Sequence, residues 1–114
     1  MSTPATRIAT RHRGETRYFE AADIVRFWAS AKYTNFRLEG EEHVVDVSLT
    51  ALERSLVALG FVRIHRSDLV RLSAIVALRE TRGTVEVELG DGQRARVSRR
   101  HLPGLRASLE GRRP

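Results

Sequence analysis

Residues 61–72 read FVRIHRSDLVRL and decide the fold, because they join an apolar strand pattern directly to a polar cluster. The first four residues suit a core, and Phe61, Val62 and Ile64 can anchor the segment there. The next eight, HRSDLVRL, hold five polar or charged side chains and three aliphatic ones. A strand that is patterned for the core and ends in charge predicts a polar turn that a sheet holds at the surface.

Short strands separated by turn residues account for most of the remaining chain, since branched and aromatic residues recur at every second position. Phe36 and Leu38 share one face of such a strand, and the polar residues next to them share the other. Gly40 then provides a turn. The strands expected before residue 50 are 6–12 and 16–21, as a hairpin around Gly14, followed by 23–30, 34–40 and 42–47.

Residues 84–98, TVEVELGDGQRARVS, predict a hairpin whose register can be worked out. A loop of only Asp91 and Gly92 would set the apolar Val87 against the charged Arg96. A three-residue loop, 90–92, keeps each face uniform, with Gly92 supplying the positive φ that such loops need. The predicted pairs are Val85 with Val97, Val87 with Ala95, Glu86 with Arg96, and Glu88 with Arg94. The two exposed ion pairs in this register would occupy both arginines.

Two short helices are expected. In residues 50–60, TALERSLVALG, Thr50 and Glu53 stand at capping-box spacing and Gly60 can end the helix. The leucines of this segment fall on one side, which would pack on a sheet. A second, shorter helix is expected after Pro103, where leucines continue an apolar stripe. The pattern as a whole predicts a mostly β fold with one or two short helices.

With 114 residues the chain is long enough for one domain, expected over 7–110 between tails at 1–6 and 111–114. It holds no apolar run of the length of a membrane span, and its first residues lack the apolar core of a signal peptide. Cysteine is absent, which suits a reducing compartment. These features predict a cytoplasmic protein.

The net charge of +6 resides entirely in the second half of the chain. Residues 1–60 hold 8 Lys and Arg against 8 Asp and Glu, whereas residues 61–114 hold 12 against 6. A basic half indicates a polyanionic partner, and nucleic acid is the commonest such partner for a protein of this class. The alternative is a basic surface that only contacts solvent.

The residue types of a nucleophilic triad are present, but they lie too close together in the sequence to form one. His65, Ser67 and Asp68 lie within four positions, whereas a nucleophilic triad is assembled from separate segments. The four histidines show no ligand spacing, and there is neither a GxGxxG motif nor a Walker loop. We therefore predict no catalysis, no metal and no cofactor.

Basic and polar residues gather where strands meet loops or a helix start, and such positions suit nucleic-acid contacts. Arginine can read guanine through two parallel hydrogen bonds, while lysine, threonine and asparagine can hold phosphates or single base edges. The candidate residues are Lys32, Tyr33, Thr34 and Asn35, then His65 and Arg66, then Arg99, Arg100 and His101.

Several motifs occur in an order and spacing that resemble a known family. An HRS tripeptide ends a strand and is followed by LV, then by a DG hairpin, and then by SRR before the last helix. With these motifs, residues 7–110 resemble the LytTR family of bacterial DNA-binding domains. The resemblance implies an elongated stack of small antiparallel sheets with about ten short strands. It also implies a transcription regulator whose loops enter successive major grooves of double-stranded DNA, often as two copies on a direct repeat.

The resemblance also assigns roles to individual positions. His65 has two interpretations, a hydrogen bond that fixes its loop, which we favour, and a direct contact with DNA. The family's DNA-contacting positions fall on Thr34, Arg66 and Arg100, flanked by Lys32, Tyr33, Arg99 and His101.

Two positions depart from the family pattern. Asp68 stands where an aromatic residue is usual, and Arg71 where asparagine is common. An acid two residues from Arg66 could pair with it or repel phosphate. The departure motivates an alternative function, a protein-interaction module that has lost its DNA affinity. These domains usually follow a receiver or a membrane segment, so we expect a single-domain regulator, which Met1 favours, or a piece of a longer chain.

Overall fold

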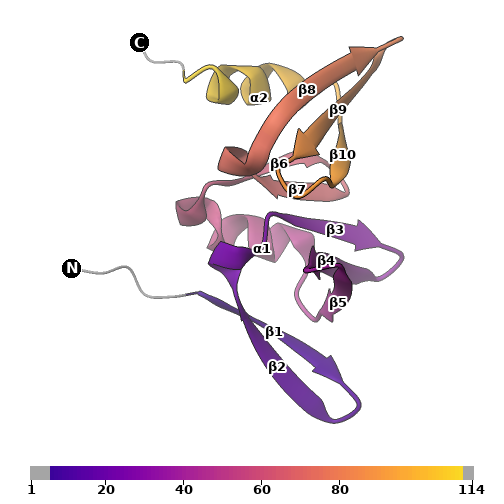
Figure 1. Ribbon diagram of the computed structural model, residues 1–114, viewed down its shortest axis with the longest axis vertical. Coiled ribbons are helices and arrows are strands. Elements are labelled where there is room, and N and C mark those ends of the chain that lie inside the picture. Colours follow the sequence, from indigo (N-terminus) through magenta and orange to yellow (C-terminus); the bar gives the residue numbers. More distant parts are fainter. Residues whose placement is uncertain (1–5, 112–114) are drawn as a thin grey trace, which may run out of the picture.

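The computed structural model describes residues 6–111 and is mostly β (Figure 1). It holds ten strands and two α-helices, which confirms the expected fold class. The strands are β1 Arg7–His12, β2 Glu15–Glu20, β3 Arg26–Ser30, β4 Tyr33–Leu38, β5 Glu41–Val45, β6 Phe61–His65, β7 Asp68–Arg71, β8 Ile75–Thr81, β9 Thr84–Leu89 and β10 Arg94–Val97. The helices are α1 Leu49–Ser55 and α2 Leu102–Leu109, with 3-10 helices η1 Ala21–Asp23, η2 Val57–Leu59 and η3 Leu72–Ala74.

The strands form two antiparallel sheets. Seven strands follow the order β2-β1-β5-β4-β3-β7-β6, and β10-β9-β8 form the second sheet. The molecule measures 45 × 39 × 23 Å, and the sheets follow one another along its longest axis (Figure 1). Within residues 6–111 no helix is long and apolar enough to cross a membrane. The expected tails, 1–6 and 111–114, fall outside the described range except for Thr6 and Gly111.

The predicted hairpin register is confirmed for all four residue pairs, but the ion pairs on it differ from the prediction. Arg94 lies 3.8 Å from Glu86, diagonally across the strands, and Glu88 pairs with Arg79 of β8. Because β8 covers the other edge of β9, it supplies a nearer partner for Glu88. Arg96 therefore makes no ion pair within the described chain.

The helices lie where they were expected, with one wrong cap. α1 begins one residue before Thr50, and its N-cap is Ser48, whose hydroxyl accepts a hydrogen bond from the Ala51 N–H at 3.1 Å. Glu53, the expected partner in a capping box, turns instead to Arg63. Gly60 ends the helical segment as predicted, with φ of +81°.

Two hydrophobic cores flank the β6–β7 hairpin. Phe61 and Leu69 belong to the core beneath α1, where they meet Phe27 and Phe36. Their neighbours on the opposite face, among them Ile64, belong to the core between the second sheet and α2. Strand alternation thus sends successive side chains of one hairpin into both cores. The β6–β7 hairpin is buried on both faces and joins the two sheets.

The buried acid at the start of β7 is paired, although not with Arg66. Asp68 is 6% exposed, and its Oδ1 accepts a hydrogen bond from Arg26 Nε at 2.8 Å. The Arg26 guanidinium also lies over the Trp28 ring, 4.7 Å from its centroid, and reaches Gln93 in the loop between β9 and β10. A charge-assisted pair with these extra contacts satisfies the carboxylate that the sequence left unexplained.

Arg71, the second departure from the family pattern, has a structural role. Its Nη2 donates to the carbonyls of Ala21 and Ile24 at 2.6 and 2.8 Å, and its Nη1 donates to Leu59 at 3.2 Å. Burial lowers the pKa of the Arg71 guanidinium, and the nearby Asp23 opposes that shift. Arg71 therefore ties η1 and the residue after it to the end of η2, which leaves it unsuited to a DNA contact.

We predict that Asp68→Ala lowers the free energy of unfolding by about 3 kcal/mol, because it leaves the Arg26 charge partly buried and unpaired. Glu42→Ala is the matched control, since the Arg37–Glu42 pair is exposed, with side chains 45% and 56% accessible. That control should cost less than about 1 kcal/mol. Urea unfolding measures both, and equal losses would contradict the role given to the buried pair.

Candidate nucleic-acid interface

A β-bulge shapes the turn that carries Arg66. The pairing of β6 with β7 shifts register between Arg63 and His65, which leaves Ile64 outside the ladder. The Ile64 carbonyl instead accepts a hydrogen bond from the Ser98 N–H at 2.8 Å. Bulges commonly redirect a strand in this way. This bond brings the segment that follows β10, with its SRR sequence, against the end of β6.

The β3–β4 turn lies on the other side of the same hairpin. Trp28 pairs with Asp68, and the Ala29 N–H donates to the Ser67 carbonyl at 2.9 Å. Two residues later the chain turns at Ala31 and Lys32 into β4. Because antiparallel neighbours alternate in direction, this turn and the β6–β7 turn project from the same edge of the sheet. Figure 1 shows them on one side of the molecule, together with the β8–β9 turn.

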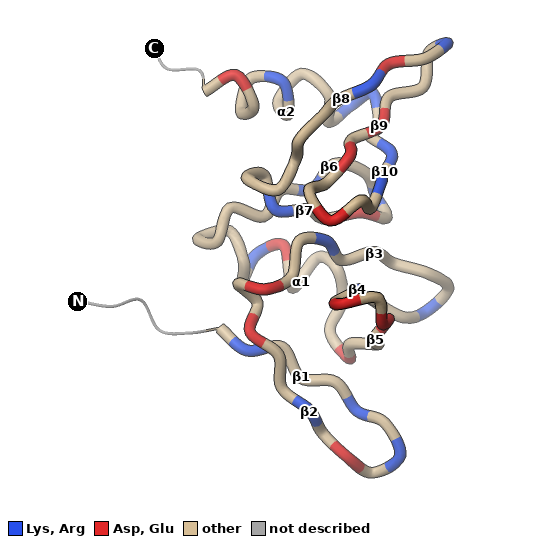
Figure 2. The backbone as a smooth tube through the Cα atoms, viewed as in Figure 1, with Lys and Arg blue, Asp and Glu red and all other residues tan. Residues whose placement is uncertain are grey.

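Three candidate groups from distant parts of the sequence therefore meet at one edge, which we call the turn edge: residues 31–35, 65–67 and 98–101. Lys and Arg positions occur along this side of the molecule in Figure 2, with acidic positions between them. Lys32, Arg66, Arg99 and Arg100 are exposed, and none of them makes an ion pair with any residue of 6–111. Unpaired cations on rigid turns suit the phosphates and base edges of a nucleic acid.

The three residues after Lys32 differ in how far they are exposed. Tyr33 is 55% exposed and Asn35 donates from Nδ2 to the Trp28 carbonyl at 3.4 Å. Thr34 is only 5% exposed, on the face of β4 that also carries Phe36. A DNA contact through the Thr34 hydroxyl is therefore not supported. The alternation that placed Phe36 in the core already predicted this burial, because Thr34 lies two residues before it.

His65 fixes the shape of its turn, as the favoured interpretation expected. The Ser67 N–H donates to His65 Nδ1 at 3.2 Å, and the Ser67 hydroxyl donates to Asp68 Oδ2 at 2.8 Å. The Ser67 hydroxyl thus contacts side chains rather than backbone. A continuous chain of hydrogen bonds thus runs from His65 through Ser67 and Asp68 to Arg26.

His101 lies just before α2, with its Nδ1 2.5 Å from the Ser98 hydroxyl oxygen. Burial lowers the pKa of His101, and the positive charges of Arg100 and Arg63 lower it further. Arg63, Arg100 and His101 line one pocket, which places the end of β6 next to the start of α2.

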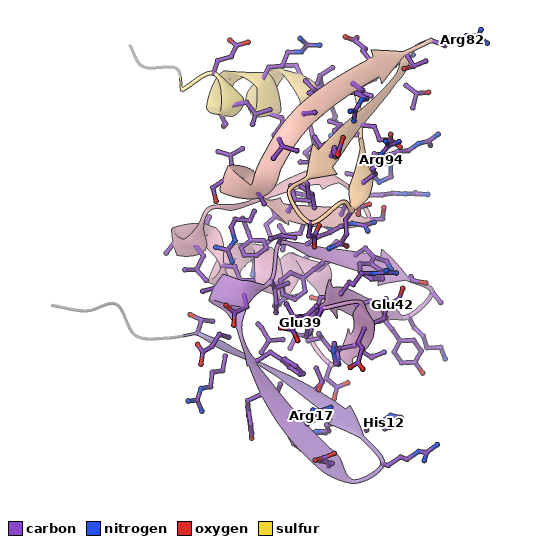
Figure 3. All side chains as sticks on the ribbon, viewed as in Figure 1. His12, Arg17, Glu39, Glu42, Arg82 and Arg94 are labelled. Atoms are coloured by element: carbon purple, nitrogen blue, oxygen red, sulfur yellow. The ribbon has the colours of Figure 1, made fainter. Side chains whose placement is uncertain are left out.

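Sequence reasoning missed three arginines near this edge. Arg63 was not singled out, and its side chain holds the β6–β7 turn. Arg96 was set aside as paired, yet it is unpaired among the described residues and lines one pocket with His65 and Ser98. Arg82 is exposed at the tip of the β8–β9 hairpin, where Figure 3 shows it pointing away from the molecule. The arginine–glycine turn at 82–83 was the available signal for it.

With this geometry in place, comparisons with known proteins identify the family. The model of the LytTr DNA-binding domain matches residues 14–110. The chain belongs to the LytTr DNA-binding domain family. This is a family of DNA-binding domains rather than of enzymes.

Three known proteins illustrate the range of the family. The chain is 35% identical over 108 residues to the positive alginate biosynthesis regulatory protein of Pseudomonas aeruginosa, covering 92% of this chain and 43% of that protein. It is 29% identical over 100 residues to the heme-containing CO-sensing transcriptional regulator RcoM 2 of Paraburkholderia xenovorans, covering 84% of this chain and 38% of that protein. A LytTr DNA-binding domain from Bacillus cereus superposes with a TM-score of 0.78 over 93% of this chain and 97% of its own, at 22% identity, which shows the shared fold. The chain thus spans less than half the length of the regulators from Pseudomonas aeruginosa and Paraburkholderia xenovorans.

We predict that His101 contributes stability that is lost in acid. Its pKa in the folded protein lies below the ordinary value of about 6.5, so the unfolded chain takes up the proton first as pH falls. The contribution is complete above about pH 6.5 and declines as pH falls through the folded-state pKa. Urea unfolding from pH 8 to pH 5 should therefore show a smaller acid loss for His101→Gln than for the parent. A His101 pKa at or above 6.5 by NMR titration would contradict this.

Proposed function

We propose that this LytTr domain binds double-stranded DNA sequence-specifically as the DNA-reading part of a bacterial transcription regulator. The observation that carries the proposal is the meeting of unpaired cations at the turn edge, with Arg66 on one turn and Arg99 and Arg100 on the adjoining segment. The family membership and the two regulators among its relatives support the same function.

In this proposal the turns enter the major groove and arginines read bases. Arg66 and Arg100 can each make two parallel hydrogen bonds to guanine. Lys32, Tyr33 and Arg99 flank them and contact phosphates, with Asn35, His65 and His101 supporting the turns that carry the contacts. The molecule is 45 Å long, and successive major grooves on one face of DNA are about 34 Å apart. One copy is therefore long enough to reach two grooves, and two copies would occupy a direct repeat.

The alternative, a protein-interaction module, drew its support from Asp68. That carboxylate is buried and paired with Arg26, on a turn whose outward side chain is Arg66. An acid neutralised in this way adds little repulsion toward phosphate. The geometry therefore favours the DNA-binding function.

Selection of random duplex sequences by the purified chain tests the proposal. An enriched motif, repeated at about one helical turn, would support sequence-specific binding to a direct repeat. Failure to enrich any motif, together with recovery of a protein partner, would replace it with the interaction module.

We predict that Arg66→Ala and Arg100→Ala each weaken binding to the selected duplex by about 1 to 3 kcal/mol and relax preference at a base pair. Arg7→Ala serves as the control, because Arg7 is exposed and paired with Glu20 at the start of β1. Fluorescence anisotropy with base-substituted duplexes measures the effect. Losses equal to that of the control would exclude base reading by the two arginines.

Arg96 offers a second test through its salt dependence. If about five phosphates are neutralised, the logarithm of affinity should fall with the logarithm of salt concentration at a slope near −4 or −5. Arg96→Gln should reduce this slope by about 1, whereas Arg94→Gln should leave it nearly unchanged. Both arginines are exposed on β10, but Arg94 is paired with Glu86, whereas Arg96 is unpaired among the described residues and lines a pocket with His65 and Ser98. Equal slopes for the two variants would remove Arg96 from the interface.

A further inference from the structure

Arg63 holds the peptide groups on both sides of Arg66. Its Nε donates to the His65 carbonyl at 3.1 Å, and its Nη2 donates to the Arg66 carbonyl at 3.2 Å. The first oxygen belongs to the peptide before Arg66 and the second to the peptide after it. Fixing both peptides fixes the direction in which the Arg66 side chain leaves the backbone. The fork of guanidinium donors suits this task, which a lysine could not perform.

Glu53 of α1 binds the remaining nitrogen of the same guanidinium, Nη1. Arg63 Nη1 lies 2.5 Å from Glu53 Oε1, and the Arg63 side chain is 17% exposed. α1 is itself fixed, since Leu49 and Leu52 are buried in the first core. The contacts therefore connect a rigid helix to the turn that carries Arg66 through two side chains.

A carboxylate at this position is unexpected in a surface meant for DNA. Glu53 is paired with Arg63, which lines a pocket with Arg100 and His101, so it lies beside the turn edge. An acid there lowers the attraction for phosphates. Arg63, for its part, has all three of its nitrogens engaged with protein atoms and little exposure, so it is poorly placed to bind a phosphate.

We propose that Glu53 and Arg63 form a clamp that positions Arg66 for base reading, and that Glu53 is a determinant of DNA specificity although it touches no DNA. The inference rests on the proposed function. Its physical basis is preorganisation: a side chain whose backbone is already fixed loses less conformational freedom on binding. Preorganisation strengthens binding to the selected duplex but not to unrelated duplex, because only base reading requires the Arg66 side chain to leave the backbone in one direction.

The comparison of Glu53→Ala with Glu42→Ala tests the clamp. Each variant removes one acid from an ion pair with arginine and raises the net charge by one. Electrostatics alone would make both bind DNA slightly more tightly. The clamp predicts opposite signs, with Glu53→Ala binding the selected duplex about three- to tenfold more weakly while its affinity for unrelated duplex is unchanged or higher. Tighter binding of both variants to the selected duplex would overturn it.

A double-mutant cycle with Arg66→Ala separates positioning from a general loss of structure. Because Glu53 acts through Arg66, Glu53→Ala should weaken specific binding in the parent and have almost no further effect once Arg66 is removed. An undiminished effect in the Arg66→Ala background would overturn the clamp. If the parent chain itself selects no motif, the proposed function fails, and the clamp fails with it. A parent that selects a motif while Glu53→Ala behaves like Glu42→Ala defeats the clamp alone.

Arg63→Lys adds a variant that keeps the charge. Lysine cannot reach both carbonyls and Glu53 with one flat group. Specific affinity should fall, and the salt slope should stay at the parental value because no cation is lost. Specific affinity that stays at the parental value would overturn the positioning role, because the positive charge alone, as in a phosphate contact, would then suffice.

Discussion

The β6–β7 hairpin is buried on both faces, and the arrangement of the whole molecule depends on this constraint. Phe61 and Leu69 pack into one core while Ile64 and Val70 pack into the other, so the hairpin cannot shift register without disrupting both. The bulge at Ile64 frees a carbonyl, and Ser98 binds it. The turn edge is therefore a consequence of how the two sheets are joined.

The same junction explains how acids can lie beside a surface of unpaired cations. Asp68 is neutralised by Arg26, and Glu53 is engaged by Arg63. The side chains of Arg26 and Arg63 are mostly buried, and neither Asp68 nor Glu53 forms an ion pair with Arg66. Among the described residues, some arginines, such as Arg63 and Arg71, hold backbone carbonyls, and others form exposed ion pairs, as Arg7 and Arg37 do. Within residues 6–111, Arg66, Arg99 and Arg100 remain exposed without an ion pair. Sequence position alone does not distinguish them.

Alternation and turn chemistry predicted much of the fold, because these are local properties. The register of β9 with β10 followed from keeping apolar and charged faces uniform, and Gly60 predicted the end of the first helical segment. The cap at Ser48 was missed because Thr50 offered a similar local pattern. The pairing of Asp68 with Arg26 could not be predicted, since 42 positions separate the two residues and only the β3–β7 pairing brings them together. The ends of the strands supplied the candidate positions, and the resemblance to the LytTR family selected Thr34, Arg66 and Arg100 among them. Alternation with Phe36 was enough to predict the burial of Thr34, whereas the contacts of Arg63 required the structure.

In the proposed function, turns from three parts of the chain act as one DNA-binding surface. NMR titration of the isotope-labelled chain with its selected duplex, monitored by the chemical shifts of the backbone amides, tests whether they do. We expect the largest shift changes in residues 31–33, 65–67 and 98–101, all at the same DNA concentration. Changes confined to only one of these turns, or centred on the face formed by η2 and the end of α2, would contradict it.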